Sequence, residues 1–268
     1  MATKCIVLIT GGNTGIGYET IKALYASPQP HTVLMGSRSL DKAAAAISTL
    51  KSEIPESNSE IIPIQINIES DASINAAFTR VSTDYGRIDT LVNNAGAAFD
   101  TPSSPLPLRE SWAATFSLNI TSTHIFTTTF IPLLLLSPTP RLLFITSGLS
   151  SLHTSSAGRT SKSAPSTTSR GWPKPGGAAH MLAYRSSKCA LNMVMLEWKR
   201  VLEPDGVKVY GISPGFLATG LGGMGREYMA SVGAGEASVG GEFVKRVVEG
   251  ERDGDEGRVI NKDGVQEW

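Results

Sequence analysis

Residues 5–17 have the sequence CIVLITGGNTGIG and combine three structural signals in one short stretch. The apolar run of residues 5–9 predicts a buried strand, and the pattern of residues 16–26 predicts an amphipathic helix. Between them, Gly11, Gly15 and Gly17 allow the backbone to turn tightly from the strand into the helix. The stretch therefore predicts a strand–turn–helix unit, the building block of parallel α/β sheets.

The same alternation of short apolar runs and longer amphipathic stretches continues along the chain. Strands are expected at residues 5–9, 32–35, 60–66, 90–93, 141–146, 207–212 and 258–260. Helices are expected at residues 16–26, 41–53, 72–85, 109–136 (with a bend near Pro132), 181–202 and 240–249. This order predicts a single α/β domain over residues 1–268: a Rossmann-type doubly wound, mostly parallel sheet of strand order 3-2-1-4-5-6-7, with helices on both faces.

Composition excludes several classes of partner. The 268 residues carry 24 basic and 24 acidic side chains, so no net field attracts nucleic acid or an anionic membrane. The apolar runs at residues 5–9 and 131–136 are shorter than a secretory signal core and a membrane span of about 20 residues, respectively. Two cysteines do not suggest a disulfide framework. We expect a cytoplasmic protein with reduced thiols and without a metal.

The glycine turn also predicts a ligand. Its backbone can approach a pyrophosphate closely, and the helix N-terminus offers free N–H groups and partial positive charge. The next strand ends at Ser37 and Arg38, where an acidic residue would accept hydrogen bonds from the ribose hydroxyls of NAD. Because no acid is present there, Ser37 and Arg38 can instead donate to a 2′-phosphate. This favours NADP(H) over NAD(H); the alternative is an ordinary exposed arginine.

Tyr184 and Lys188 are four residues apart and so lie on one face of the expected helix. Such a pair is common on solvated helices, but here it follows the glycine turn, residues 93–96 (NNAG), Asn119 and Ser147 in the chain. Together these motifs resemble those of the short-chain dehydrogenase/reductase superfamily over nearly the whole chain. The final third is similar to filamentous-fungal members, many of which serve secondary metabolism.

The resemblance implies a set of site residues. The catalytic residues would be Ser147, Tyr184, Lys188 and Asn119. The residues expected to contact the cofactor come from the glycine turn, several strand ends, the Tyr/Lys helix and the segment after residue 213: Gly11, Asn13, Thr14, Gly15, Ile16, Gly17, Ser37, Arg38, Asn67, Ile68, Asn94, Ala95, Gly96, Tyr184, Lys188, Pro214, Gly215, Leu217 and Thr219.

The chemistry implied is the interconversion of a ketone and a secondary alcohol by hydride transfer. Reduction leaves charge on the substrate oxygen, so a proton donor is needed, and the ordinary tyrosine pKa of about 10 is high for that task near neutrality. Lys188 is expected to lower the pKa of Tyr184 and, by resemblance, to bond the nicotinamide ribose. Ser147 would hydrogen-bond the substrate oxygen, and Asn119 would hold a water that links Lys188 to solvent.

The sequence departs from the family pattern in three places. The 36 residues between Ser147 and Tyr184 form a longer segment than the family usually has. Asn67 and Ile68 stand where an aspartate usually contacts the adenine; an asparagine can still accept a hydrogen bond. Thr14 replaces the basic residue that many NADP-using members carry in the glycine turn. This leaves Arg38 to provide most of the expected preference for NADP(H) over NAD(H).

Two stretches interrupt the strand–helix alternation. Residues 150–179 are rich in Ser, Thr, Gly and Pro and contain basic residues but no acid. This composition is typical of a solvated loop, while the position between Ser147 and Tyr184 leaves an active-site lid as the alternative. Residues 219–241 are crowded with glycine and predict a flexible flap over a substrate pocket.

The leading hypothesis is an NADP(H)-dependent carbonyl reductase or alcohol dehydrogenase for an apolar or aromatic small molecule, with Phe216, Leu217, Met224 and Trp172 as possible pocket residues. One alternative keeps the fold and cofactor but performs an isomerase, dehydratase or cyclisation step. Another is an NADP-sensing regulator, which has less need of the Tyr/Lys pair. By resemblance, the helix at residues 109–136 would pair subunits in a homodimer or homotetramer.

Overall fold

An eight-stranded sheet forms the centre of the protein in the computed structural model, which describes residues 4–101, 104–158, 170–171, 181–223 and 225–268. The strand order is β3-β2-β1-β4-β5-β6-β7-β8, and only the last pair is antiparallel. The predicted order of the first seven strands is therefore confirmed. The strands are β1 (Cys5–Ile9), β2 (His31–Ser37), β3 (Glu60–Gln65), β4 (Thr90–Asn93), β5 (Arg141–Ile145), β6 (Lys208–Ile212), β7 (Val259–Asn261) and β8 (Gly264–Val265).

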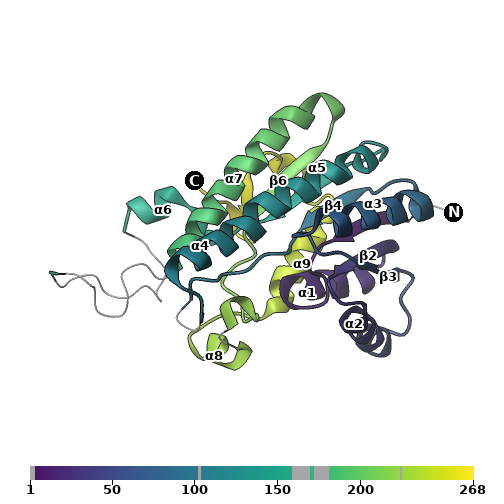
Figure 1. Cartoon of the computed structure of the whole chain (residues 1–268). Helices are drawn as coiled ribbons and strands as arrows, with labels where there is room; N and C mark the ends of the chain where they lie inside the picture. Colours follow the sequence, from purple (N-terminus) through teal and green to yellow (C-terminus); the bar gives the residue numbers. More distant parts are fainter. Residues whose placement is uncertain (1–3, 102–103, 159–169, 172–180, 224) are drawn as a thin grey trace.

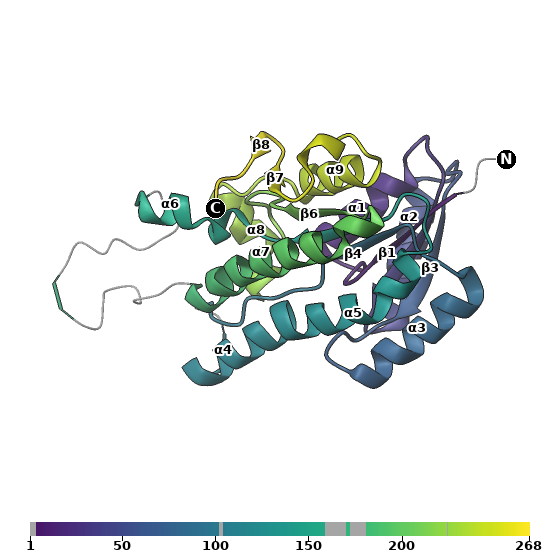
Figure 2. The same ribbon diagram turned by 90° about the horizontal axis from the view of Figure 1, so that it is seen from above.

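Helices cover both faces of the sheet (Figures 1 and 2). On one face lie α3 (Asp71–Tyr85), α4 (Leu108–Phe116), α5 (Thr123–Leu134) and α7 (Leu182–Leu202), and on the other lie α1 (Gly15–Tyr25), α2 (Leu40–Glu53) and α9 (Ala237–Val248). The short helices α6 (Leu152–Ser156) and α8 (Arg226–Ser231) belong to connections. None of the helices in the described ranges is long and apolar enough to cross a membrane.

Two apolar cores result from the alternation of side chains along each strand. In β1, Leu8 packs with Phe126 and Phe130 of α5 on one face. Its neighbour Ile9 packs with Ile21 of α1 on the other face. Because successive strand residues point to opposite faces, a continuous apolar run is required when both faces are covered. The run at residues 5–9 meets that requirement, and it places the following glycine turn at the edge of the sheet.

The expected single helix at residues 109–136 is divided into α4, a π-helical segment (Ser117–Ser122) and α5. The interruption lies around Asn119 rather than at Pro132, which sits within α5. π-Helical turns are rare and occur often at functional sites. The expected flap at residues 219–241 also contains more structure than its glycine content indicates, since it includes α8 and the start of α9.

Candidate active site

The turn after β1 is held from the end of β4. The Asn94 side-chain amide donates to the carbonyl oxygens of Thr10 (2.8 Å) and Gly11 (3.2 Å). In return, the Thr10 hydroxyl accepts hydrogen bonds from the backbone N–H groups of Asn94 and Ala95, both at 3.0 Å. These four bonds join two strand ends that are more than 80 residues apart in sequence. The turn is therefore rigid before any ligand arrives.

The glycines of this turn are required by space and by backbone conformation. A Cβ at Gly17 would lie 2.5 Å from both the Gly11 oxygen and the Asn94 amide nitrogen, and Gly11 and Gly15 have φ of +64° and +58°. The first turn of α1 carries no acidic residue, and Thr14 at its N-cap makes no side-chain capping bond. In this described turn, the N–H groups at the start of α1 thus remain available to an anion, which fits the pyrophosphate of a dinucleotide.

Ser37 and Arg38 differ in their availability. Ser37 is buried, and its hydroxyl lies 3.1 Å from the Asn13 side-chain oxygen and 2.9 Å from the Ser39 oxygen. Ser37 thus links the end of β2 to the glycine turn. Arg38 is exposed and has no acidic partner among the described residues. Of the two, Arg38 is the side chain that is free to meet a ligand.

Asn67 and Ile68 also have structural contacts of their own. The Asn67 side-chain oxygen accepts from the Glu69 N–H (3.2 Å), and its backbone N–H donates to the Ser73 hydroxyl (3.0 Å). Ile68 is buried in the core on the α3 face. Its side chain therefore packs inside the protein, and only its backbone can meet an adenine ring.

Ser147, Tyr184 and Lys188 come together at the end of β5. Tyr184 and Lys188 lie on α7 and are only 6% and 4% exposed. The Lys188 Nζ lies 5.8 Å from the centroid of the Tyr184 ring and donates to the Ile145 oxygen at 2.7 Å. The Ser147 side chain lies close enough to the Tyr184 phenol to lower its pKa. The three residue types needed for proton donation to a carbonyl oxygen are thus adjacent, with Tyr184 and Lys188 shielded from water and Ser147 half-buried.

The electrostatics of this trio correct one expectation. Burial raises the pKa of Tyr184 to about 12, and the nearby Ser147 side chain opposes this only in part. Burial also lowers the pKa of Lys188 to about 8. The expected lowering of the tyrosine pKa by Lys188 is therefore not met by the protein alone. The reason is that both groups lose their hydration, while the Lys188 ammonium bonds to the Ile145 oxygen.

The Asn119 side chain connects the loop after β4 to α7. Its oxygen accepts from the Ala97 N–H, and its nitrogen donates to the Ala97 oxygen and to the Ser187 hydroxyl, all at 2.9 Å. Gly96 lies within this arrangement, since a Cβ there would be 3.0 Å from the Asn119 oxygen and 3.3 Å from the Lys188 Nζ. Asn119 is thus a brace next to Lys188, and its role in holding a water stays a prediction.

The segment after β6 lies against the glycine turn. Pro214, Leu217 and Ile16 converge on Gly240 of α9, where a Cβ would lie 2.5 to 3.2 Å from their side chains. The Thr219 Cβ lies 3.8 Å from the position a Cβ would take at Gly15. This contact brings the two expected cofactor segments side by side. Phe216 is 49% exposed, whereas Trp172 and Met224, also expected to line the pocket, fall outside the described residues.

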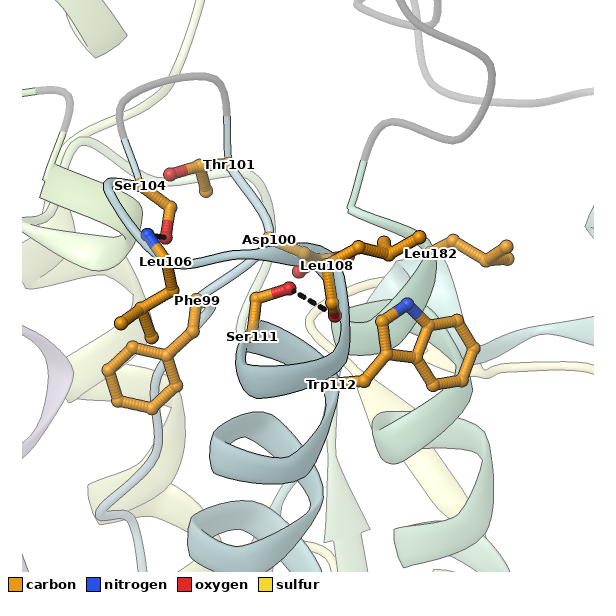
Figure 3. A pocket seen from close by; sticks show the side chains of 9 residues that line it. All are labelled: Phe99, Asp100, Thr101, Ser104, Leu106, Leu108, Ser111, Trp112 and Leu182. Atoms are coloured by element: carbon orange, nitrogen blue, oxygen red, sulfur yellow. Dashed lines mark hydrogen bonds between the residues drawn. The ribbon is translucent and has the colours of Figure 1, made fainter.

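An open hollow of about 500 Å³ lies beside the start of α7 (Figure 3). Its lining combines apolar side chains with one carboxylate and three hydroxyls: Phe99, Asp100, Thr101, Ser104, Leu106, Leu108, Ser111, Trp112 and Leu182. Leu182 precedes Tyr184 by two residues, so the hollow is next to the candidate catalytic helix. No sequence pattern singles out Asp100 of this lining. The backbone N–H groups on α7 that donate to its carboxylate are 83 and 84 residues away in the chain.

Comparison with known proteins agrees with the geometry of the fold. The family described as short chain dehydrogenase matches residues 5–172. The short-chain dehydrogenase/reductase eupG of Phoma sp is 48% identical, covering 99% of this chain and 98% of its own length. The short-chain dehydrogenase/reductase tropE of Talaromyces stipitatus is 45% identical, covering 98% of this chain and 97% of its own length.

Among solved structures, the NADPH-bound carbonyl reductase from chicken fatty liver has a TM-score of 0.76 at 21% identity and covers 99% of this chain and 100% of its own. The L-sorbose reductase of Gluconobacter frateurii, complexed with NADPH and L-sorbose, has a TM-score of 0.73 at 16% identity and covers 98% of this chain and 97% of its own. At these identities the structures show the fold alone. The sequence matches go further: this chain belongs to the short-chain dehydrogenase/reductase family.

Proposed function

We propose that the protein is an NADP(H)-dependent oxidoreductase that interconverts a ketone and a secondary alcohol. The observation that carries the proposal is the cluster of half-buried Ser147 with buried Tyr184 and Lys188, at the sheet edge that also holds the glycine turn. A non-redox enzyme would need a nucleotide site, but it would not need this complete proton-donating trio. A regulator that only senses the cofactor would need it still less.

The glycine turn and the start of α1 would hold the pyrophosphate, and Lys188 with Gly96 would lie at the nicotinamide ribose. The bound cofactor supplies the hydride. Gly96 fits this role because a side chain there would press against the Asn119 oxygen (3.0 Å) and the Lys188 Nζ (3.3 Å). Arg38 supports NADP(H), since an exposed guanidinium without an acidic partner can take a 2′-phosphate by charge-assisted hydrogen bonds. The NADPH named with two similar folds is consistent with this choice.

In reduction, Tyr184 donates its phenolic proton to the substrate oxygen. A pKa of about 12 keeps this phenol protonated throughout the neutral range, so it is ready as a donor. Ser147 can hydrogen-bond the same oxygen, because its side chain lies near enough to the phenol to affect its pKa. Lys188, with a pKa of about 8, is mostly charged at neutral pH and favours the developing phenolate.

The proposed substrate is an apolar or aromatic small molecule of the kind found in fungal secondary metabolism. Its support is the apolar part of the hollow beside α7, chiefly Leu106, Leu108 and Trp112, together with exposed Phe216 in the segment after β6. A cytoplasmic location and independence from membranes and nucleic acid remain part of the proposal.

We further propose a homodimer or homotetramer formed through α5 and α7. These helices expose apolar side chains on their outer faces, including Ile125, Met193 and Val201. Isolated exposed apolar residues are common, so the support is their grouping on two neighbouring helices. Light scattering coupled to gel filtration tests this directly: a mass of one chain at micromolar concentration would refute it.

The function is tested by NADPH consumption with a panel of ketones, diketones and quinones, with NADH and the Tyr184→Phe variant in parallel. We expect turnover with NADPH and a loss of about 10²- to 10⁴-fold in kcat in the variant, the range typical of a lost general acid. NADPH affinity should hardly change, since only a hydroxyl is removed. Saturable NADPH binding with no turnover on a broad panel would favour the non-redox enzyme or the sensor, and absence of binding would refute all three.

A further inference from the structure

Helix α7 begins without a capping group of its own. Its N-cap residue, Met181, has no side-chain oxygen and adopts φ +54°, the only positive φ of a non-glycine residue in the described ranges. The first turn of α7 contains no acidic residue. Yet Tyr184 lies in that turn. The N–H groups at a helix start need partners, and without them the first turn frays.

A carboxylate from a distant loop supplies these partners. One oxygen of Asp100 accepts from the Ala183 N–H at 2.6 Å, and the other accepts from the Tyr184 N–H at 3.3 Å. Figure 3 shows Asp100 on the loop after β4, beside Leu182. A negative charge at a helix N-terminus also interacts favourably with the helix dipole. Asp100 therefore caps α7 from outside, and one of its two bonds is made to the candidate proton donor itself.

The loop that carries Asp100 is fixed on both sides of it. Before Asp100, the Ala97 backbone makes two hydrogen bonds with the Asn119 side chain, which also reaches Ser187 on α7. After Asp100, the Thr101 hydroxyl donates to the Gly222 oxygen at 3.0 Å. The carboxylate is thus held by a frame that does not depend on α7 alone.

We propose that Asp100 is a positioning residue that holds the first turn of α7, and with it Tyr184, at the place from which the phenol reaches Ser147 and the substrate. The inference rests on the proposed function of Tyr184. Lys188 lies one turn further on and has its own contact with the Ile145 oxygen, so loss of Asp100 displaces Tyr184 more than Lys188. Misplacement of a reacting group by about 1 Å can reduce the rate by about 10².

The test compares Asp100→Ala and Asp100→Asn with Ser70→Ala. Ser70 is the N-cap of α3, where its hydroxyl accepts from the Ser73 N–H, so it serves as a matched loss of a helix cap. Three quantities are measured: kcat, the KM for NADPH, and amide hydrogen exchange of residues 182–188. The exchange measurement needs no substrate.

For Asp100→Ala we expect kcat to fall by about 10- to 100-fold with the KM for NADPH unchanged. Exchange at residues 182–188 should accelerate. Asp100→Asn retains one acceptor oxygen and should recover part of kcat and of protection, whereas Ser70→Ala should change none of these quantities.

The proposal is overturned if exchange at residues 182–188 is the same in wild type and both Asp100 variants. It is also overturned if kcat is unchanged, or if Ser70→Ala lowers kcat equally. Faster exchange in Asp100→Ala, in a protein that reduces no carbonyl compound, would refute the proposed reaction while it leaves the cap itself established.

Discussion

The turn after β1 and the segment after β6 lie side by side at the same edge of the sheet, but they are held in different ways. The first is braced by Asn94 and Thr10 through four hydrogen bonds and is filled so tightly that Gly17 has no room for a methyl group. The second packs at its start against Gly240 of α9 through Pro214 and Leu217. Beyond that, it is joined to its surroundings by a short bridge between Leu217 and Gly235 and by the Thr101–Gly222 bond. Several of its glycines have open space around them.

The difference matches two tasks. A dinucleotide is the same ligand in every catalytic cycle, so its turn can be preorganised, and preorganisation lowers the free-energy cost of binding. A substrate pocket formed by a loop can change shape or admit different molecules, and such loops come from the least stable parts of a fold. We infer that the turn after β1 determines cofactor affinity and that the segment after β6 determines which substrate enters.

The largest effect is expected when a glycine is replaced by alanine in the turn after β1, and the same replacement in the segment after β6 serves as the comparison. Gly17→Ala places a methyl group 2.5 Å from backbone and amide atoms that cannot move without breaking the brace. Overpacking of this kind costs about 1–3 kcal/mol, so NADPH affinity should fall by at least about tenfold or the protein should lose thermal stability. Isothermal titration and thermal unfolding measure the two effects.

The matched variant is Gly220→Ala, in the segment after β6. A Cβ at Gly220 meets nothing within 4 Å, so NADPH affinity and the unfolding temperature should stay at wild-type values. Equal damage from both substitutions would break the comparison, since it would show that the second region is as constrained as the first.

The next effect concerns the direction of the reaction. Alcohol oxidation requires Tyr184 to accept a proton, and burial raises the pKa of Tyr184 to about 12. The oxidation rate should therefore rise about tenfold per pH unit from pH 6 toward pH 8, where Lys188 begins to lose its charge. Reduction should be nearly flat over the same range. Initial rates of oxidation and reduction, measured across this pH range, test the prediction. If the two rates change with pH in the same way, the phenol of Tyr184 is not protonated as proposed.

Arg38 sharpens the comparison within the rigid region, because its side chain is exposed there. Arg38→Ala should raise the KM for NADPH by about tenfold, the value of one hydrogen bond to a charged group, and should leave the KM for NADH unchanged. If both values rise equally, Arg38 stabilises the fold of the turn and does not read the 2′-phosphate.

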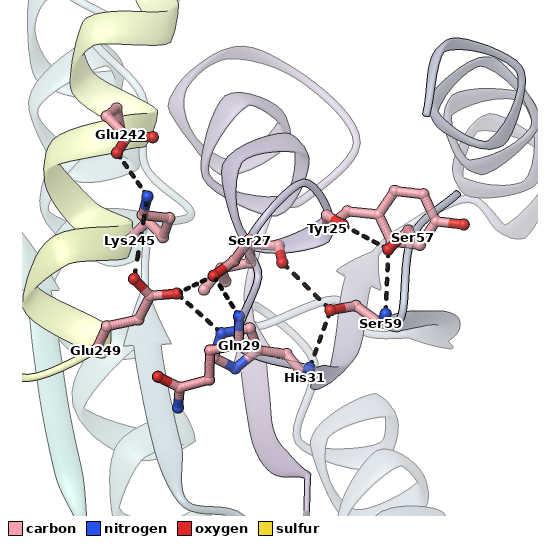
Figure 4. A network of polar contacts seen from close by, with 10 residues as sticks. Tyr25, Ser27, Gln29, His31, Ser57, Ser59, Glu242, Lys245 and Glu249 are labelled. Atoms are coloured by element: carbon pink, nitrogen blue, oxygen red, sulfur yellow. Dashed lines mark hydrogen bonds and ion pairs between the residues drawn. The ribbon is translucent and has the colours of Figure 1, made fainter. Parts of the chain in front are cut away.

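The smallest expected effect lies at the opposite edge of the sheet and concerns stability (Figure 4). There the buried His31 ring bonds to Glu249 at 3.1 Å, and Glu249 in turn lies 3.9 Å from Lys245. Burial lowers the pKa of His31, and the bond to Glu249 only partly opposes this. The folded protein therefore holds His31 neutral, whereas the unfolded chain takes up a proton below about pH 6.5.

The contribution of His31 to the free energy of unfolding is complete above about pH 6.5. It is lost as the pH falls from 6.5 toward the lower pKa of His31 in the folded state. Thermal unfolding at pH 7.5 and 5.5 should show a smaller pH-dependent drop for His31→Gln than for wild type. An equal drop in the two proteins would exclude His31 as the source.

Local sequence patterns were enough for the strand–helix order and for the glycine turn, because periodicity and turn residues act over short distances. The spacing of Tyr184 and Lys188 placed both on one helix face for the same reason. Ile68 shows the limit of this approach: the resemblance implied a cofactor contact there, but only the folded structure shows that its side chain lies in the core and leaves the backbone for such a contact. The π-helical segment was not predicted, and the side chain of Asn119 within it bonds to Ala97 and Ser187, which are 22 and 68 residues away.

The sequence by itself determined the class of fold, the order of the central strands and the residue types available for proton transfer, since each follows from hydrophobic periodicity or side-chain chemistry. The tertiary structure alone decided that burial raises the pKa of Tyr184 and lowers that of Lys188, and that Asp100 caps α7. Desolvation depends on everything that surrounds a group, and a hydrogen bond across 83 residues exists only after the chain has folded.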